Sequence, residues 1–580
     1  MIVKMKKIIL ITQSKDMESA LESVRKLGLL HVEHENAPSG GNIAALKERL
    51  SRISKAIAVL PDIKNQGAAD RDKADSLADE ISALLDEKET LAEELQILKS
   101  GIEEWKEWGD FDPDIIEDME DKNVWVKLCK INVRELGKIP EGVAMEEMFR
   151  KGNIVYCAVI SKKEVELPFE TLNLPGMSVG EMVFKEKKIE ERFGLIEKRL
   201  SEIAGHKNSL RDHENYLKSV IEFNEVREGS GRFEKLSYIK GYSPADKINV
   251  IETAASMEKW GIVIADPLEN DVPPTLIKNP KWVEIIKPMF NIIKTIPGYK
   301  EVDISLHFLV FFSIFFGMLI GDAGYGMIYF LLALIAQKKA KAVKDKSIFF
   351  LIYVLSSCAI AWGLMTGIFF GPHPWMRPMV PYFADNTNVQ AFCFLIGAVQ
   401  LSLAHAWKIL RRFPSLKILS DAGWICVLWS VYFLAKTLIL GFEYPGFGKW
   451  LFIAGSCLII LFTSPAKNIL AGIGSGLGDY LLKVVNSFAD TVSYIRLFAV
   501  GLAGVAIANA FNQIASGIGC GSVSSCLLSG FVLFAGHSLN LAMGILSILV
   551  HGVRLNVLEF SGHLDMEWSG TEYSPFKVKQ

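Results

Sequence analysis

The stretch Ser493-Tyr494-Ile495-Arg496-Leu497-Phe498-Ala499-Val500-Gly501-Leu502-Ala503 places an arginine near the middle of a long apolar segment, residues 480–516. A guanidinium keeps its charge at any biological pH, and inserting it at the centre of a membrane helix costs at least about 2.5–3.5 kcal/mol. Such a side chain normally faces a protein interface or a water-filled cavity. The segment is therefore predicted to be a membrane span with a function.

The rest of the chain divides into two halves of different composition. Residues 1 to about 300 are rich in Lys and Glu, whereas residues 304 to about 562 are almost uninterrupted apolar blocks. Transmembrane helices need about 20 apolar residues. Eight segments fit: about 304–320, 324–337, 347–371, 389–412, 419–441, 448–464, 480–516 and 524–561.

Four of these spans depart from a simple crossing. The first two are short and joined by residues 321–326, so we expect a broken hairpin. The last two are too long to cross perpendicularly, because a helix over residues 480–516 reaches about 55 Å against a hydrocarbon core of about 30 Å. We expect them to tilt, bend or project into water.

Positive charges between the spans predict the orientation. With eight spans, the connections after the second and fourth lie on the side of the N-terminal half, and they hold a cluster of cations: Lys338, Lys339, Lys341, Lys344, Lys346, Arg411, Arg412 and Lys417. The opposite connections hold only Arg377 and Lys449. The positive-inside rule therefore predicts a cytoplasmic N-terminal half and a cytoplasmic C-terminus.

Cys520 and Cys526 fall in the outward connection between the last two spans. A disulfide is possible there if that compartment is oxidising, but we expect free thiols because the pair is isolated.

The N-terminal half carries two heptad segments, about 42–108 and 185–228. Apolar residues in alternating steps of three and four predict a narrow seam, and hence an antiparallel coiled coil. The polar stretch from Pro61 to Ser76, which contains Gly67, predicts a break. The alternative is two helices of a compact bundle.

Short β-like runs flank the coiled coil. Residues 124–128 and 154–160 predict a distal α/β lobe at about 110–180, and a proximal lobe is expected from residues 1–36 and 232–270. The apolar run within residues 1–12 is too short for a signal peptide and is expected to be a buried strand.

The predicted fold is therefore an α-helical polytopic membrane domain, residues 301–563, plus cytoplasmic α/β lobes joined by an antiparallel coiled coil, residues 1–300. Residues 564–580 are expected to form a cytoplasmic tail.

Composition and motifs exclude several classes of function. The formal net charge of −3 is too small for a nucleic-acid partner. Cys129 and Cys157 have no metal-ligand spacing and are expected to be reduced, buried thiols. The Gly-rich run 472–478 lacks the Lys-Ser/Thr ending of a Walker A motif and is expected to be a loop, so this chain alone should not hydrolyse ATP. No cofactor and no metal are expected.

Polar side chains follow one face of each of the last two spans. In the eighth span they recur in steps of three and four: His537, Asn540, Gly544, Ser547, His551 and Arg554. The seventh has a shorter stripe: Asn486, Asp490, Ser493 and Arg496. Two such stripes, each ending at an arginine, suggest the walls of an interrupted aqueous path. The alternative is an internal salt bridge, for instance from Asp490 to one arginine.

Five stretches resemble those of one family, the membrane stator subunit (a or I) of rotary V/A-type ATPases. Residues 493–503 are similar to its arginine-bearing helix, and residues 551–560, which include Glu559, to its second arginine motif. Residues 316–326 resemble its first-hairpin signature, residues 272–275 its pre-membrane linker, and residues 573–576 its ending.

The resemblance implies a mechanism and partners. A ring of proteolipids (c/K subunits), each with a carboxylate, would turn against the last two spans in the cell membrane of a bacterium or archaeon. Arg496 and Arg554 would attract the ionised carboxylate, displace its proton or Na⁺, and stop ions from crossing directly between two half-channels.

Weaker candidates for ion translocation are Asp490, Ser493, His537, Asn540, Ser547, His551 and Glu559. The N-terminal half would be the family's stator arm, bound to peripheral stalks of E/G-type subunits in a complex with central-stalk and catalytic subunits. The chain departs from eukaryotic members, which carry a glutamate where Gly544 stands and a histidine where Gly504 stands.

Two other classes of protein would give different sequence patterns. A secondary transporter with a regulatory domain predicts internal repeats with interrupted helices, and none is evident. A membrane-anchored coiled-coil scaffold would not need intramembrane arginines. Copurification of a proteolipid ring would separate the stator from both.

Overall fold

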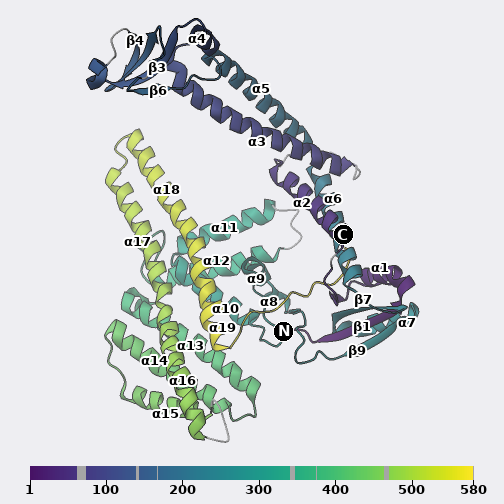
Figure 1. Ribbon diagram of the computed structural model, residues 1–580. Helices are drawn as coiled ribbons and strands as arrows, with labels where there is room; N and C mark the ends of the chain where they lie inside the picture. Colours follow the sequence, from purple (N-terminus) through teal and green to yellow (C-terminus); the bar gives the residue numbers. More distant parts are fainter. Residues whose placement is uncertain are drawn as a thin grey trace. The chain divides into compact units, whose positions relative to one another are not determined.

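A computed structural model describes residues 1–38, 40–61, 73–138, 143–165, 167–339, 346–373, 375–462 and 469–578, with the backbone alone over 469–479. Figure 1 shows its helices and strands. The chain divides into two compact units. Unit 1 comprises Met1–Ile9, Leu29–His31 and Gly241–Pro575, and unit 2 comprises Leu10–Gly28, Val32–Lys240 and Phe576–Gln580.

Four helices of unit 2 pack as antiparallel partners: α2 (Gly41–Val59), α3 (Ala74–Trp105), α5 (Val179–Ala204) and α6 (Lys207–Gly229). The direction follows from ion pairs across α3 and α5. Arg199 pairs with Glu80 at 2.7 Å and Arg192 with Glu87 at 2.6 Å. Ile81, Leu98 and Ile196 are buried in the seam between the helices. A coiled-coil supercoil stays a prediction.

The second heptad segment was predicted to be one helix over about residues 185–228. The structure instead contains two helices, α5 and α6. Helix α5 ends at Ala204 and α6 begins at Lys207, because Gly205 and His206 form a turn through hydrogen bonds to the carbonyls of Glu202 and Ile203. The heptad pattern skips from Ile203 to Leu210 at this point. Of the break predicted over residues 61–76, the part from 62 to 72, which includes Gly67, lies outside the described residues.

A four-stranded sheet of unit 2 contains β3 (Trp125–Asn132), β4 (Ala144–Lys151), β5 (Ile154–Ser161) and β6 (Glu170–Leu172) in the order β4-β5-β3-β6. Cys129 faces Cys157 across the β3–β5 ladder, and both thiols are fully buried and free. Burial raises the pKa of the Cys129 thiol to about 11. The prediction of buried, reduced thiols is confirmed.

A second sheet has the order β2-β8-β1-β9, with β7 paired to β8. Its strands are β1 (Met5–Gln13), β2 (His31–Glu33), β7 (Gly231–Phe233), β8 (Leu236–Pro244) and β9 (Gly261–Ala265). The predicted N-terminal strand is thereby confirmed. Helices α1 (Met17–Leu27) and α7 (Ile248–Met257) follow β1 and β8 in the chain.

Unit 1 holds the apolar helices: α10 (Ser305–Ile320), α11 (Ala323–Lys339), α12 (Ser347–Thr366), α13 (Asn386–Arg412), α14 (Ile418–Leu440) and α15 (Gly446–Phe462), then α16 (Ile469–Ser493), α17 (Ile495–Ile518) and α18 (Val523–Ser547). Among the described residues, five helical stretches are long and apolar enough to cross a membrane, and α10 and α15 are shorter apolar helices. Eight spans stay a prediction. Lys341 and Lys344, used to predict orientation, lie outside the described residues.

Two expectations for the apolar half were wrong. Residues 472–478 lie in α16, which begins at Ile469, rather than in a loop. Glycine has a low helix propensity, which was the reason for expecting a loop. The third span ends at Thr366, since Gly367 takes a left-handed φ of 74° that stops the helix.

The last two long segments are each interrupted near their arginine. Tyr494 separates α16 from α17, and α18 continues through two π-helical segments, η7 (Ile548–Gly552) and η8 (Leu555–Phe560), into α19 (Ser561–His563). The helices α17 and α18 run side by side (Figure 1). Both long segments are thus interrupted in the helix, whereas the expected tilt, bend or projection into water stays a prediction.

The first and last apolar helices begin and end on one side of unit 1. The side chain of Glu301, just before α10, accepts hydrogen bonds from the backbone N–H groups of Glu567 and Trp568, just after α19, at 2.6 and 3.2 Å. Arg411, at the end of α13, donates to the carbonyl of Lys300 at 3.3 Å. These contacts hold the start of α10, the end of α13 and the segment after α19 together.

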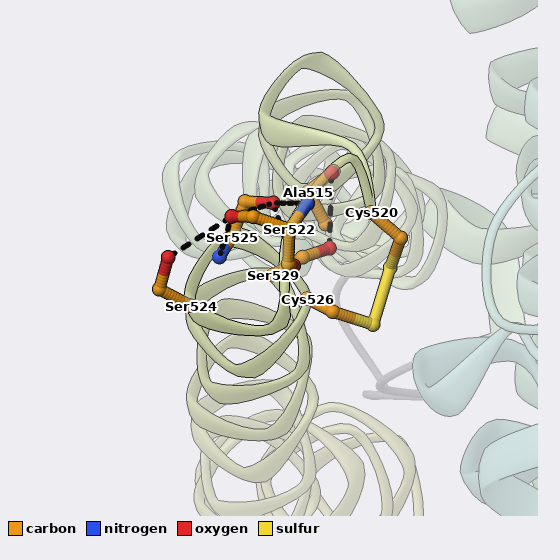
Figure 2. Close-up of a disulfide and its surroundings, with 7 residues drawn as sticks. All are labelled: Ala515, Cys520, Ser522, Ser524, Ser525, Cys526 and Ser529. Carbon is orange, nitrogen blue, oxygen red and sulfur yellow. Dashed lines mark hydrogen bonds between the residues drawn. A yellow bond between two sulfur atoms is a disulfide. The ribbon is translucent and has the colours of Figure 1, made fainter.

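Cys520 and Cys526 form a disulfide, so the expectation of free thiols was wrong (Figure 2). The turn between α17 and α18 brings the cysteines together. Ser522 caps α18 by accepting from the N–H of Ser525, and Ser529 donates to the carbonyl of Ala515 at 3.0 Å. Sequence spacing alone does not show that this capped turn holds the two Cα atoms 4.3 Å apart.

We predict that a membrane-impermeant maleimide added outside intact cells labels Cys520 and Cys526 only after a reductant, because the disulfide leaves no thiol to react. Labelled sites are read by peptide mass spectrometry. The Cys526→Ser variant, which frees Cys520, is the control and should react without reductant. Labelling of the unreduced wild type would contradict the disulfide.

Candidate functional site

Arg496 and Arg554 lie against the same carboxylate. Arg496, in the first turn of α17, donates from Nη2 to Glu559 Oε1 at 2.8 Å, and the Nε of Arg554 lies 3.4 Å from the same oxygen. The hydroxyl of Ser493 donates to it as well, at 3.0 Å. We call Arg496, Arg554, Glu559 and Ser493 the arginine cluster.

The arginine cluster is unequally exposed and carries an excess charge. The Glu559 side chain is 4% exposed and that of Arg496 24%, whereas that of Arg554 is 54% exposed. Two guanidiniums share one carboxylate, which leaves one positive charge over. The other oxygen of Glu559, Oε2, is buried without a hydrogen-bond partner among the described residues. The cluster can therefore attract one further carboxylate.

A second link joins the two arginine motifs. Tyr494 is fully buried and donates to Gln400 Oε1 at 2.8 Å, and Gln400 donates to Asn556 Oδ1 at 3.0 Å. Gly397 leaves room for the Tyr494 ring, since a Cβ there would lie 2.6 Å from it. Tyr494, two positions before Arg496, is thus linked through Gln400 to Asn556, two positions after Arg554.

The π-helical segments place these side chains. Each π turn widens the helix by one residue and rotates the residues after it, so η7 and η8 set the directions of Arg554 and Glu559 separately. Such bulges are frequently found at functional sites. An undistorted helix would put residues 554 and 559 on different faces.

The predicted stripe of the eighth span partly lines a cavity. A hollow of about 330 Å³ between α17, α18 and the α10–α11 hairpin is bordered by Asn540, Ser547 and His551. The Nδ1 of His551 is buried and has no hydrogen-bond partner among the described residues. The hollow thus extends to within one helical turn of Arg554.

His537 lies apart from this cavity, in a network with the first hairpin. Its Nδ1 lies 2.7 Å from the hydroxyl of Tyr325, which also accepts from Asn540 at 3.0 Å. Its Nε2 lies 3.2 Å from Asn512 Oδ1. The stripe residues His537 and Asn540 are therefore both held by Tyr325.

Asp322 explains the hairpin signature. Its Oδ1 accepts backbone hydrogen bonds from Gly324 at 2.7 Å, Tyr325 at 3.3 Å and Phe370 at 2.9 Å, and its Oδ2 accepts from Gly371 at 2.8 Å. The side chain is buried, so it caps α11 and holds the loop after α12 without water. These hydrogen bonds fix the start of α11, so that the Tyr325 hydroxyl lies within hydrogen-bond distance of His537.

Gly544 and Gly504 border the same cavity. A Cβ at Gly544 would lie 3.0 Å from the hydroxyl of Tyr329, and a Cβ at Gly504 would lie 3.4 Å from Asn540 Oδ1. Tyr329 and Asn540 thus occupy the space into which larger side chains at these positions would project.

Asp490 does not pair with either arginine. Its Oδ2 lies 3.2 Å from His563 Nε2. The alternative of an internal salt bridge is correct in that Arg496 has an ionic partner, but the partner is Glu559, which the sequence pattern did not single out as a counter-ion.

Sequence reasoning missed Tyr325, Asp322, Gln400 and Asn556 as parts of the site. A polar residue inside an apolar span was the available signal for Gln400 and Asn556. In the part of the chain that the structure describes, no three His, Cys, Asp or Glu side chains converge as a metal site would require.

The linker and tail motifs pair with each other within unit 1. Thr275 donates its N–H to the carbonyl of Thr571 at 2.7 Å, and Tyr573 donates to the carbonyl of Thr275 at 3.1 Å. The Tyr573 hydroxyl donates to the carbonyl of Leu29 at 2.6 Å, and burial raises the pKa of this hydroxyl to about 12. Two stretches far apart in sequence are therefore one structural element.

We predict that Asp322→Ala strongly lowers the thermal stability of the protein, because four backbone N–H groups lose their acceptor at about 1–3 kcal/mol each. Asp385→Ala is the matched control, since Asp385 caps α13 through Thr387 alone at an exposed position. The melting temperatures of both variants in detergent provide the measurement. A fall no larger than that of the control would contradict the role assigned to Asp322.

Several known proteins are similar to this chain over most or all of its length. No protein-family model matches it. V-type ATP synthase subunit I of Borreliella burgdorferi is 32% identical over 100% of this chain and 99% of its own. V-type ATP synthase subunit I 1 of Treponema pallidum is 29% identical over the whole of both chains. A-type ATP synthase subunit I of Methanocaldococcus jannaschii is 23% identical over 67% of this chain and 64% of its own.

A solved structure, the cytoplasmic N-terminal domain of subunit I, homolog of subunit a, of V-ATPase, is also similar. It is 14% identical and covers 45% of this chain and 99% of that chain, with a TM-score of 0.24.

Proposed function

Because the chain belongs to the family of V-type and A-type ATP synthase subunit I, we propose that it is the non-catalytic membrane stator of a rotary ATPase. In this role it couples the movement of H⁺ or Na⁺ to rotation of a proteolipid ring. The observation that carries the proposal is the arginine cluster, in which two guanidiniums share the one carboxylate of Glu559.

The excess positive charge is the basis of the mechanism. A ring carboxylate that loses its ion becomes an anion in a medium of low dielectric, and Arg554, which is half exposed, is the guanidinium within its reach. Attraction to the cluster favours the ionised form, so the ion is displaced as the carboxylate arrives. The same fixed charge repels cations that would cross without rotation.

Polar groups on the side of the disulfide suggest the outward half-channel. The cavity bordered by Asn540, Ser547 and His551 reaches toward Arg554 from that side, with the Tyr325–His537 pair beyond it. Asp490, which lies on α16 before the arginine, is the candidate for the inward side. Rotation would then be the only connection between the two.

The other parts of the chain take the roles expected of the family. Residues 1–300 would form the cytoplasmic arm that binds E/G-type peripheral stalks, residues 301–563 the ion-translocating domain, and residues 564–580 the cytoplasmic tail. Central-stalk and catalytic subunits would complete the complex in the cell membrane, and this chain alone would not hydrolyse ATP. The hydrogen bonds of Glu301 to residues 567 and 568 support placing both ends of the membrane domain on one membrane side.

We predict that Arg496→Ala leaves the complex assembled but abolishes ATP-driven ion uptake into liposomes, because the cluster then loses its excess charge. Assembly is checked by copurification of the proteolipid ring. Arg377→Ala, which removes an exposed arginine from the connection between α12 and α13, is the control and should not change uptake. Normal uptake by assembled Arg496→Ala complexes would refute the proposal.

A second variant tests the counter-ion. Glu559→Gln keeps the shape and an acceptor oxygen but removes the negative charge, so an arriving ring carboxylate is held by two cations and released slowly. A charge-assisted hydrogen bond contributes about 1.5–3 kcal/mol, so we expect the initial rate of ion uptake to fall by about tenfold or more. A rate equal to that of the wild type would show that Glu559 is a structural residue only.

A further inference from the structure

A cavity of about 440 Å³ lies where the chain enters its first apolar helix. It is bordered by α8 (Lys281–Glu284), α9 (Lys287–Ile293), the first residue of α10, the linker at Thr275 and the tail at residues 572–573. Its volume falls within the range of about 300–1,000 Å³ that is typical of small-molecule sites. None of its lining residues belongs to the arginine cluster, so the cavity is a site of its own.

Apolar contacts fix one wall of the cavity against α10. Ile286 and Met289 are buried in the same apolar cluster as Phe308 of α10. The ring centroids of Phe290 and Phe308 lie 5.0 Å apart. Helices α8, α9 and α10 accordingly lie close together in Figure 1. Because Ser305, the first residue of α10, borders the cavity, the cavity is built at the end of that apolar helix.

The face of α9 that borders the cavity is flanked by two lysines. Lys287, Phe290 and Asn291 follow one another in steps of three and one, which places them on one helix face, and Lys294 continues the row directly after the helix. Lys294 has a left-handed φ of 57°, which is uncommon for a residue other than glycine. Its N–H caps α9 by donating to the carbonyl of Phe290 at 2.8 Å. The fold thus holds two ammonium groups at the edge of one cavity.

Two carboxylates border the same cavity. They belong to Glu284 on α8 and to Glu572 in the tail. Within the described parts of the chain, none of these two glutamates and two lysines forms an ion pair with another side chain. A ligand with one charge of each sign would give both pairs a partner, because charge-assisted hydrogen bonds are the strong ones.

Exposed apolar side chains surround the cavity. Trp282 on α8 is 61% exposed, Ile292 on α9 is 60% exposed, and Leu306 in the first turn of α10 is 40% exposed. Tryptophan is enriched at membrane–water interfaces, where its ring is in an apolar layer and its N–H reaches water. With α10 entering the bilayer, the cavity would lie at the level of the lipid headgroups.

We propose that this cavity binds the headgroup of a membrane phospholipid with a phosphate and a primary ammonium group, as in phosphatidylethanolamine. This inference rests on the placement of residues 301–563 in the membrane, which is part of the proposed function. Lys287 and Lys294 would donate hydrogen bonds to the phosphate. Glu284 and Glu572 would accept hydrogen bonds from the ammonium group. A headgroup without an ammonium would leave both carboxylates unpaired, and a quaternary ammonium has no N–H to donate.

The first test uses the wild-type full-length chain in detergent and needs no variant. Phosphatidylethanolamine with a photoreactive group on its acyl chain is added and irradiated, and the crosslinked peptides are identified by mass spectrometry. We expect crosslinks within residues 275–306. Unlabelled phosphatidylethanolamine should halve the crosslink yield at a concentration about tenfold or more below that of phosphatidylglycerol or phosphatidylcholine, the effect of one charge-assisted hydrogen bond.

Two results of this test would overturn the proposal. One is the absence of crosslinks within residues 275–306, and the other is equal competition by the three lipids. Soluble O-phosphoethanolamine has the same charged groups without acyl chains. If it competes at the same concentration as the lipid, the occupant is a soluble molecule and the lipid is overturned.

The second test uses two double variants. Lys287→Ala with Lys294→Ala removes both partners of the phosphate, so we expect crosslinking to require about tenfold or more lipid. Glu284→Gln with Glu572→Gln should abolish the preference for phosphatidylethanolamine over phosphatidylglycerol. The control is Lys281→Ala, because Lys281 is an exposed lysine of α8 that does not border the cavity. Unchanged crosslinking in the lysine variant would overturn the site, and if a variant does not fold, the lipid preference of the wild type decides.

The outcomes separate this proposal from the stator function, because crosslinking needs neither ATP nor the ring. Loss of uptake in Arg496→Ala without any lipid preference in the wild type would overturn the lipid site alone. Normal uptake in Arg496→Ala together with the expected crosslinks would overturn the stator function and leave the lipid site supported.

Discussion

The apolar half of this protein is organised around a charge that cannot be removed. A guanidinium stays protonated, so Arg496 and Arg554 require a counter-ion once the helices are packed. Glu559 supplies it, although 63 residues separate it from Arg496 in the sequence. The position of this cluster constrains the helices that carry it. Helix α17 begins where Arg496 can reach Glu559. The π-helical segments on both sides of Arg554 direct two side chains of one helix, Arg554 and Glu559, toward each other.

Neutral hydrogen bonds also hold the arginine cluster in place. The Tyr494–Gln400–Asn556 chain ties both arginine motifs to α13 without adding charge. Toward the disulfide, Asp322 holds the α10–α11 hairpin through backbone hydrogen bonds. Tyr325 of this hairpin is in turn hydrogen-bonded to His537 and Asn540. At Gly501, a Cβ would lie 2.6 Å from the carbonyl oxygen of Met318, so α10 and α17 touch through backbone. Small residues give membrane helices this close approach.

The sequence alone predicts features that depend on one residue or on the regular spacing of apolar residues. The cost of an intramembrane arginine singles out Arg496 and Arg554 without knowledge of their neighbours, and the period of the apolar residues locates most of the helices. Prediction failed where partners come from distant segments. Nothing near Asp490 shows that its partner is His563, and nothing near Cys520 shows that a capped turn returns Cys526 to it. The break at Gly205 and the helix over residues 472–478 were missed because propensity in isolation does not include packing or the surrounding solvent.

For the proposed stator function, the charge balance of the cluster gives a reason for two arginines and one glutamate. With one arginine and one glutamate the site would be neutral, and an arriving carboxylate would gain little by losing its ion. With two unpaired arginines the same carboxylate would be held too strongly to leave, and the two neighbouring positive charges would repel each other. One carboxylate shared between two guanidiniums leaves a single positive charge, on a side chain exposed enough to reach outward. In the proposed mechanism, this single charge attracts a carboxylate of the ring and also allows its release.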